Sequence, residues 1–156
     1  MKKMIYYING DMVIIDEIRF LWEELNKHHK TVSPFFKEEF QTFTFSQRKS
    51  NLNRKYKNNN LRIDIAKEEN KVVGYIISGI NEDNVGVIES FFVRDQYRNM
   101  KIGDTLMKRA LAWMESNNVR SKLVHVAFGN ERAFGFYERF GFFPRVTKMK
   151  QKQMRI

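Results

Sequence analysis

The sequence predicts a single α/β domain of the α+β kind, in which about four helices flank a mixed, mostly antiparallel sheet of roughly six to seven strands. Three observations support this fold class. A chain of 156 residues with 42% hydrophobic residues is long enough for one domain with a sizeable core. Residues 61–80 contain two apolar runs on either side of a polar turn, as expected for an antiparallel hairpin. Residues 87–128 contain a strand, a helix and a strand, a crossover that normally makes the two strands parallel.

The first sixty residues predict one strand and two helices. The strand covers residues 3–8, and Asp11 after it can cap a helix. An apolar stripe places that helix, with Ile14, Ile18, Leu21, Trp22 and Leu25 on one face. Ser33 and Pro34 predict the start of a second helix, whose many phenylalanine rings either pack on the sheet or line a substrate pocket. We expect residues 47–60, which are basic and rich in asparagine, to form a helix tail and a mobile loop.

The central stretch predicts a buried strand, a basic turn and an amphipathic helix. Residues 87–93 are mostly apolar, as in a strand covered on both faces, and residues 94–101 form a polar turn. The helix that follows has Leu106, Met107, Ala110, Leu111 and Met114 at helical spacing. A helix N-terminus presents unpaired N–H groups and a partial positive charge. Together with Arg98 and Lys101 it would make a cradle for phosphate, although a simple basic turn explains these residues equally well.

The last part of the chain predicts a short strand and one more helix. Residues 123–128 form an apolar strand, which contains His125 as either a packed residue or a catalytic base. Asn130 is a suitable N-cap and Gly141 a suitable C-terminal stop for the helix between them. One face of this helix carries Ala133, Phe134, Tyr137 and Phe140. A final extended segment begins at Phe142.

Composition excludes several kinds of function. The absence of cysteine removes disulfides, a cysteine nucleophile and thiolate metal sites, and it fits a reducing cytoplasm. Adjacent residues on a helix point in different directions, so His28 and His29 predict a solvated helix end, and we expect no metal. No apolar run is long enough to span a membrane, and the N-terminus favours a first strand over a signal peptide. We therefore expect a cytoplasmic protein without a membrane partner.

Two motifs resemble the GCN5-related N-acetyltransferase (GNAT) superfamily. The first is R/Q-x-x-G-x-G/A after a strand that ends in valine, here Arg98-Asn99-Met100-Lys101-Ile102-Gly103, five residues after Val93. Lys101 stands where glycine is usual, and glycine there tolerates positive φ, whereas lysine adds a charge attractive to pyrophosphate. The second motif is N-x-x-A-x-x-F-Y-x-x-x-G-F, represented by Asn130, Ala133, Phe136, Tyr137, Gly141 and Phe142. The resemblance covers residues 61–147, so residues 1–60 would be the variable acceptor-side part and residues 148–156 a basic tail.

The resemblance implies a cofactor site and a reaction. A member of this family transfers an acetyl group from acetyl-CoA, its co-substrate, directly to a primary amine of a small molecule or peptide in a ternary complex. The acyl-CoA would lie in a V between two splayed parallel central strands. The strand backbone and Asn130 would contact the pantetheine arm, and the basic turn would hold the pyrophosphate. The implied cofactor-binding residues are Phe91, Phe92, Val93, Arg98, Asn99, Met100, Lys101, Ile102, Gly103, Asp104 and Asn130.

Two residues are candidates for the chemistry. The resemblance places Tyr137 near the sulfur, where a phenol can protonate the leaving thiolate, unless it is a core aromatic with a bonded hydroxyl. Glu89 is a carboxylate in an apolar strand, and burial would raise its pKa and make it a better base for the amine. Alternatively, Glu89 pairs with a nearby cation and is structural. Ser90 should point to the opposite face of the strand, away from that cleft.

The net charge of +10 keeps other functions open. It favours polyanionic partners, so a basic nucleic-acid or ribosome-binding module is the main alternative, although no nucleic-acid motif accompanies the charge. A member that binds CoA without catalysis is another alternative, because Lys101 replaces the first motif glycine. A homodimer is possible. The positive charge argues against a large polycationic acceptor, unless the pocket itself is acidic.

Overall fold

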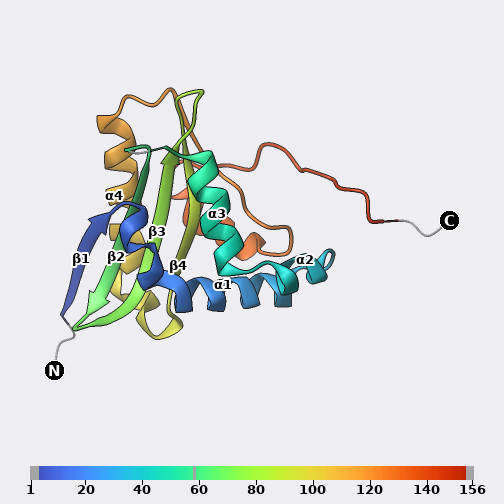
Figure 1. Ribbon diagram of the computed structural model, residues 1–156, viewed down its shortest axis with the longest axis horizontal. Helices are drawn as coiled ribbons and strands as arrows, with labels where there is room; N and C mark the ends of the chain where they lie inside the picture. The colour runs from blue at the N-terminus through green and yellow to red at the C-terminus, as the bar shows by residue number, and fades with distance from the viewer. Residues whose placement is uncertain (1–3, 58, 154–156) are drawn as a thin grey trace.

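A five-stranded mixed sheet forms the centre of the computed structural model, which describes residues 4–57 and 59–153 (Figure 1). The strand order is β1-β2-β3-β4-β5. The bounds are β1 (Ile5–Gly10), β2 (Leu61–Glu68), β3 (Lys71–Ile80), β4 (Val85–Val93) and β5 (Ser121–Val124). The first three pairs are antiparallel and β4 pairs with β5 in parallel. The predicted hairpin, the predicted crossover and the mixed, mostly antiparallel α/β sheet are therefore confirmed.

The number of strands is smaller than predicted. In the described residues the sheet has five strands, and no strand follows β5 up to residue 153. The predicted strand at residues 123–128 begins earlier and ends at Val124. The segment after Phe142 is extended, but Val146 and Met149 are 81% and 91% exposed, so apolar burial does not hold it against the sheet edge. Lys3 of the predicted first strand and residues 154–156 of the predicted tail lie outside the described residues.

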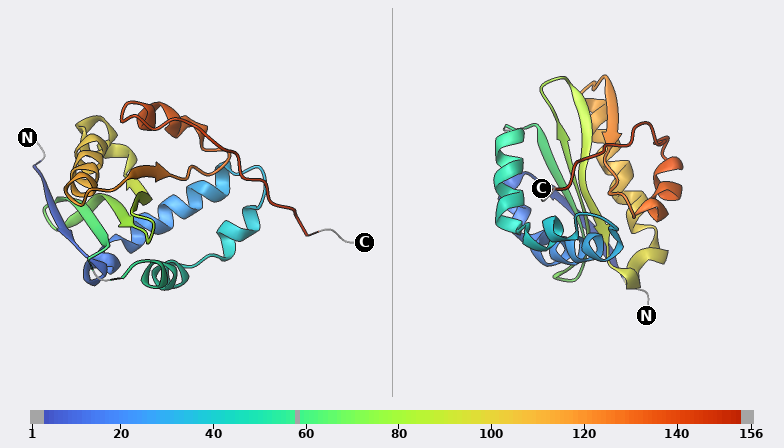
Figure 2. Two further views of the ribbon diagram at one scale, coloured as in Figure 1. Left: turned by 90° about the horizontal axis from the view of Figure 1, so that it is seen from above. Right: turned by 90° about the vertical axis from the view of Figure 1, so that its right-hand side faces the viewer.

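Helices cover both faces of the sheet (Figure 2). The α-helices are α1 (Arg19–Val32), α2 (Lys37–Thr42), α3 (Phe45–Lys55), α4 (Ile102–Ser116) and α5 (Phe134–Glu138), and the 3-10 helices are η1 (Met12–Ile18), η2 (Asp95–Met100) and η3 (Glu131–Ala133). Apolar residues of η1, α1 and α3 pack on one face, against Ile63, Ile65 and Ile77. Those of α4 pack on the other, against Ile76 and Ile88. In the described part of the chain, no helix combines the length and apolarity that crossing a membrane requires.

The predicted aromatic helix after Ser33 is wrong in its bounds. The backbone N–H of Ser33 donates to the carbonyl of His29, so Ser33 ends α1 instead of starting the next helix. The aromatic residues are divided between α2 and α3, and a capping box of Thr44 and Gln47 starts α3. The expected tail after Gln47 is thus mostly helix, and Leu52 in it is fully buried. The local cap satisfies the first N–H groups of α3, which explains why a new helix begins there.

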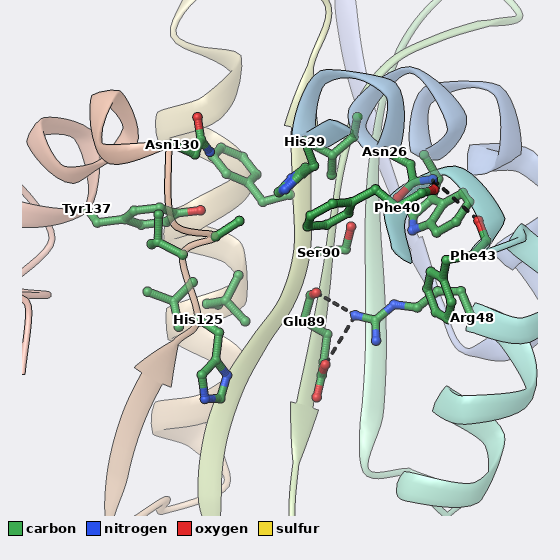
Figure 3. A pocket seen from close by; sticks show the side chains of 17 residues that line it. Asn26, His29, Phe40, Phe43, Arg48, Glu89, Ser90, His125, Asn130 and Tyr137 are labelled. Carbon is green, nitrogen blue, oxygen red and sulfur yellow. Dashed lines mark hydrogen bonds and ion pairs between the residues drawn. The ribbon is translucent and has the colours of Figure 1, made fainter. Parts of the chain in front are cut away.

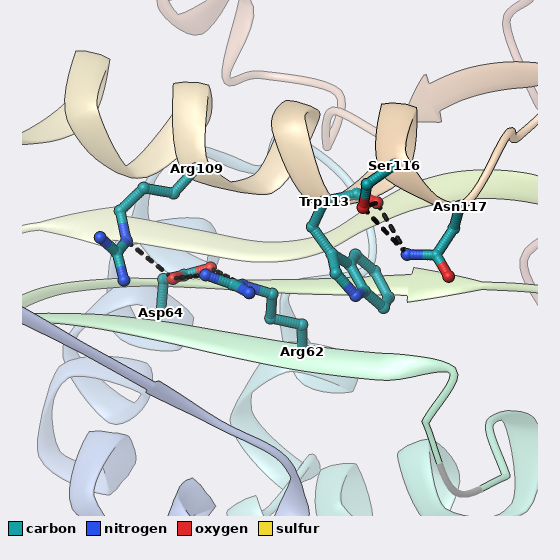
Figure 4. Close-up of polar contacts among 6 residues, drawn as sticks. All are labelled: Arg62, Asp64, Arg109, Trp113, Ser116 and Asn117. Carbon is teal, nitrogen blue, oxygen red and sulfur yellow. Dashed lines mark hydrogen bonds and ion pairs between the residues drawn. The ribbon is translucent and has the colours of Figure 1, made fainter.

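A buried ionic contact fixes α4 on the sheet (Figure 4). Asp64 of β2 has no exposed surface and accepts from Arg62 and from Arg109 of α4, each at 2.9 Å. Removing one partner of such a buried pair costs about 3–5 kcal/mol, so the contact constrains how α4 lies. At the other end of α4, the Trp113 carbonyl accepts from Ser116 and Asn117, each at 2.8 Å. The first turn of α4 is therefore presented from a firmly packed helix.

Candidate active site

The two parallel strands diverge, as the resemblance implies. β4 pairs with β5 over Val85–Ile88, opposite Ser121–Val124. The rest of β4 continues to pair with β3, up to Val93 opposite Gly74. On the β5 side, residues 89–93 therefore have no ladder partner in the described part of the chain. A free strand edge of this kind can pair with an extended ligand.

A β-bulge lies where the strands part. Ile77 of β3 pairs with Ser90 while its neighbour Ser78 pairs with Ile88, so Glu89 is an extra residue in β4. The bulge interrupts the alternation of side chains, and Glu89 and Ser90 both line one cavity. The prediction that Ser90 points away from the cleft is therefore wrong. The Ser90 hydroxyl lies 2.7 Å from the Tyr75 hydroxyl.

The cavity beside the bulge has a volume of about 220 Å³ (Figure 3). Its walls come from α1, the α2–α3 region, β4, the segment after β5, and α5. It brings together the predicted site residues Glu89, Tyr137 and Asn130. It also includes Phe40, Phe43 and His125, for which the sequence left a packing role and a site role open, and Asn26, His29 and Arg48, which were not assigned to a site.

Glu89 is held by three donors. Its carboxylate accepts from Arg48 at 3.2 Å, pairs with Lys55 at 2.7 Å and accepts from the Tyr56 hydroxyl. Arg48 also donates to the Glu89 main-chain carbonyl at 2.6 Å, and the Glu89 side chain is 8% exposed. Burial acts to raise the pKa of Glu89, but the hydrogen bonds of Lys55 and Tyr56 and the charge of Arg48 outweigh it, so the pKa lies below its ordinary value. The expected rise in pKa is wrong, and the alternative pairing with nearby cations is confirmed.

The partners of Glu89 were missed by sequence reasoning, which placed residues 47–60 in a tail and loop. The capping box at Thr44 and Gln47 could have revealed this helix. Burial, followed by the hydrogen bond and charge of Glu89, raises the pKa of Tyr56 above its ordinary range. The Tyr56 ring lies directly over Gly79 of β3, where an added Cβ would be 2.2 Å from the ring. The bare backbone of Gly79 therefore gives Tyr56 the room to reach Glu89.

Tyr137 differs from Glu89 in having an unbonded polar group. Its ring packs among Phe91, Phe136 and Phe142, with ring centroids 5.6–6.4 Å apart. Its hydroxyl points toward the middle of the cavity in Figure 3 and makes no hydrogen bond within the described residues. Burial raises the pKa of the Tyr137 phenol to about 12, which keeps the hydroxyl protonated at neutral pH. A hydroxyl in this state can donate to a ligand.

The basic turn retains the shape that its motif requires. Lys101, at the N-cap of α4, has φ 58° and ψ 22°, the left-handed conformation that glycine adopts easily. Arg98 donates to the Val93 carbonyl at the end of β4, at 3.3 Å, pairs with Asp95 of its own turn at 3.0 Å, and remains exposed. An added Cβ on Gly103 would lie 3.2 Å from Phe91. The small residue at position 103 therefore lets α4 approach β4 closely.

The other predicted cofactor-binding residues differ in whether a ligand can reach their side chains or only their main chain. Asn99 and Met100 are exposed on the turn. The side chains of Ile102 and Val93 are buried, and that of Phe92 packs toward the face covered by α1 and α3. These three residues can therefore contact a cofactor only through their main chain. Asp104 pairs with Arg139 of the segment after α5. The side chains of this predicted set are thus not all available to a ligand.

Two histidines and Asn130 connect the two sides of the cavity. Asn130 stands at the N-cap of η3, but its side chain caps nothing and instead lies 3.3 Å from His28 Nε2, so the predicted side-chain cap is wrong. Burial and the nearby His28 lower the pKa of His29 to about 4, so the ring is neutral at pH 7. His29 lines the cavity, which corrects its assignment to a solvated helix end. Gly141, at φ 87°, ends the α5 region as predicted.

No cluster of three or more potential metal ligands forms in the part of the chain that the structure describes.

Several solved structures with the same fold are named as acetyltransferases. The aminoglycoside N-acetyltransferase AAC(6')-Iy in complex with CoA has a TM-score of 0.71 and 12% identity, over 98% of this chain and 97% of that chain. A GNAT-family acetyltransferase from Staphylococcus aureus Mu50 has a TM-score of 0.69 and 18% identity, over 88% and 84%. Glucosamine-6-phosphate N-acetyltransferase from Arabidopsis thaliana has a TM-score of 0.64 and 15% identity, over 96% and 99%. At these identities the likeness shows the fold.

The family follows from the sequence itself. The family model described as the Acetyltransferase (GNAT) family matches residues 22–142. The chain therefore belongs to the GNAT acetyltransferase family, as its two motifs indicate. No curated protein sequence matches the chain.

Proposed function

We propose that this protein is an acetyl-CoA-dependent N-acetyltransferase that acts on a primary amine of a small molecule or peptide, by direct attack within a ternary complex. The observation that supports this most strongly is the divergence of β4 and β5 beside the cavity. It leaves the β4 edge from Glu89 to Val93 open to an extended ligand, next to the unbonded hydroxyl of Tyr137. The neighbour solved with CoA and the neighbour named for an amino-sugar substrate fit the same reaction class.

The residues of the cleft fit a pantetheine arm and a pyrophosphate. The main chain of Phe91–Val93 can pair with the amides of the arm as an added strand would. Behind it, α4 starts at the left-handed Lys101 with no side-chain cap on its first N–H groups, and Arg98 of the same turn is exposed. The bound thioester supplies the activated acetyl group. Lys101 thus keeps the loop geometry and adds a cation, which favours a working site over a degenerate one.

Tyr137 is assigned as the general acid. The hydroxyl has no competing partner in the described residues and stays protonated, because burial raises its pKa to about 12. It can therefore donate to the sulfur as charge develops on the departing thiolate. Holding amine and thioester together supplies further acceleration, about 7 kcal/mol or more in well-oriented cases.

Glu89 is assigned as a positioning residue. A carboxylate with a lowered pKa is a poor base for a lysine-like ammonium, whose pKa is about 10.4. Arg48 instead joins the Glu89 carboxylate to the Glu89 main-chain carbonyl, and this contact holds the bulge at which the strands part. We expect the amine to lose its proton to solvent, so kcat/KM should rise with pH together with the free-amine fraction.

The first experiment is calorimetric titration of the protein with acetyl-CoA, CoA and ATP. We expect micromolar binding of acetyl-CoA, weaker binding of ATP, and release of CoA when an amine is acetylated. Arg98→Ala should weaken acetyl-CoA binding, whereas Arg120→Ala, near the turn that precedes β4, should not. Salt-sensitive binding of RNA without affinity for acetyl-CoA would support the nucleic-acid alternative and reject the proposal. Binding without turnover of any amine would support a non-catalytic CoA-binding protein.

A further inference from the structure

A second cavity adjoins the proposed active site. It has a volume of about 390 Å³ and lies between α1 and the start of α3. The two cavities share Trp22, Asn26, Phe40 and Phe43. The Asn26 amide donates to the carbonyls of Phe40 and Phe43, at 2.7 Å and 3.3 Å, and so fixes this shared wall. The two cavities therefore have one wall in common, which brings the charged lining of the second close to the first.

The second cavity has an excess of positive charge. Its charged lining consists of Arg19, Lys27 and Lys30 against one carboxylate, Glu23. Arg19 and Glu23 lie 3.7 Å apart. Lys27 and Lys30 form no ion pair within the described residues. Two cations of this cavity thus remain uncompensated.

The first cavity adds no negative charge to offset them. Its single lining carboxylate belongs to Glu89, which Arg48 and Lys55 already neutralise. The neighbouring residues His28 and His29 of α1 add no carboxylate either. A polycationic acceptor needs carboxylates to replace the water around its ammonium groups, and the described lining offers none that is free.

We propose that the acceptor amine carries an anionic group, a carboxylate or a phosphate, which binds at Lys27 and Lys30 while the amine lies beside Tyr137. This inference rests on the proposed function, because it names the class of substrate for that site. It separates this protein from the aminoglycoside-acetylating enzymes that share its fold, whose substrates are polycations. The pair of lysines would supply charge-assisted hydrogen bonds to the anion.

The test compares acceptors that present the same amine and differ in the charge of a second group. One series is glucosamine and glucosamine 6-phosphate, and another is the amidated dipeptides Ala-Gln, Ala-Glu and Ala-Arg, in which the N-terminal amine is the only primary amine. At low salt we expect kcat/KM to be about tenfold higher for the phosphate or carboxylate member than for its neutral partner, and lowest for the cation. The two series tell a phosphate from a carboxylate. Equal rates, or a preference for Ala-Arg or for kanamycin, would overturn the inference and leave the acetyltransferase proposal intact.

Matched variants locate the effect. The double variant Lys27→Gln/Lys30→Gln should remove most of the preference for the anion, and Lys27→Glu/Lys30→Glu should reverse it. Lys108→Gln, an exposed lysine of α4 on the opposite face of the sheet, should leave it unchanged. A preference that survives in the double variant would contradict the assignment to these lysines.

A binding measurement keeps the inference separate from catalysis. Glucose 6-phosphate and glucose, which cannot be N-acetylated, are titrated into the protein saturated with CoA. We expect binding of the phosphate sugar, weakened about tenfold by Lys27→Gln/Lys30→Gln. Equal binding of both sugars would overturn the inference. A failure of the proposed function would show itself differently, as no binding of acetyl-CoA in the first titration.

Discussion

The β4 side and the α5 side of the cavity differ in how their polar groups are used. On the β4 side, the Glu89 carboxylate is bonded to Arg48, Lys55 and Tyr56. On the α5 side, the Tyr137 hydroxyl has no partner within the described residues and faces the cavity. A group whose bonds are already formed resists change during a reaction, whereas a free donor can respond to new charge. This difference indicates that Glu89 maintains the shape of the site, whereas Tyr137 takes part in the reaction.

Tyr137→Phe tests the role of the α5 side and should have the largest effect, a loss of turnover. Removing a general acid costs about 10²- to 10⁴-fold in rate, so kcat should fall by at least about a hundredfold. Acetyl-CoA affinity and stability should change little, because the hydroxyl bonds to nothing in the described structure. Steady-state kinetics and calorimetry check this, with Tyr6→Phe on β1 as the control. Wild-type turnover in Tyr137→Phe would remove the acid role.

Glu89→Ala tests the β4 side and should have the second-largest effect, a reduced free energy of unfolding. It removes the carboxylate that accepts from Arg48 and Tyr56, although Arg48 keeps the main-chain carbonyl, and breaking such a buried pair costs about 3 kcal/mol or more. Glu89→Gln, which keeps one acceptor oxygen, should lose less and retain most activity. Urea unfolding measures both, and Glu115→Ala, from the exposed pair with Lys122, should cost less than about 1 kcal/mol. If Glu89→Gln were inactive with a changed pH profile, Glu89 would be a base.

The pH dependence of stability sharpens the same comparison. Since the folded-state pKa of Glu89 lies below its ordinary value of 4.5, the unfolded chain binds the proton more readily. The stability that ionised Glu89 contributes is therefore complete above about pH 4.5 and is lost as pH falls through the lower, folded-state pKa. Unfolding free energies measured between about pH 7 and pH 3 should fall less steeply for Glu89→Gln than for the wild type. If the unfolding free energies of the two proteins fell equally with pH, the charged form of Glu89 would not be stabilised in the folded state.

Lys101→Gly should have the smallest effect and leave both sides of the cavity unchanged. The left-handed conformation strains lysine by about 1–2 kcal/mol, but glycine loses more entropy on folding, so the net change in stability should stay within about 1 kcal/mol. Loss of the cation should weaken acetyl-CoA binding a few-fold, with a smaller salt dependence. Calorimetry at two salt concentrations tests this. Abolished binding would mean that Lys101 does more than add charge.

Much of the fold was predictable because its signals are local. The turn at Glu69 and Asn70 identified the hairpin, and the alternation of strand and helix around the basic turn identified the crossover. The stop at Gly141 was also correct. Periodicity and turn residues act over a few positions, so one sequence is enough to read them.

The surroundings of Glu89 were not predictable, because they depend on distant parts of the chain. Arg48 is 41 residues and Tyr56 33 residues from Glu89 in the sequence, and their contacts require α3 to lie against β4. The bulge likewise depends on how β4 pairs with β3. Sequence reasoning identified the carboxylate but assigned its pKa from burial alone, before the donors were known.

The contact between Gly79 and Tyr56 has a consequence for how this sequence can vary. Any side chain at position 79 would enter the space of the Tyr56 ring, so the two positions are free to change only together. Among relatives, we expect glycine at the first position to accompany a large aromatic residue at the second, and a smaller second residue wherever glycine is lost. Redesign of the acceptor side would have to substitute these two positions together.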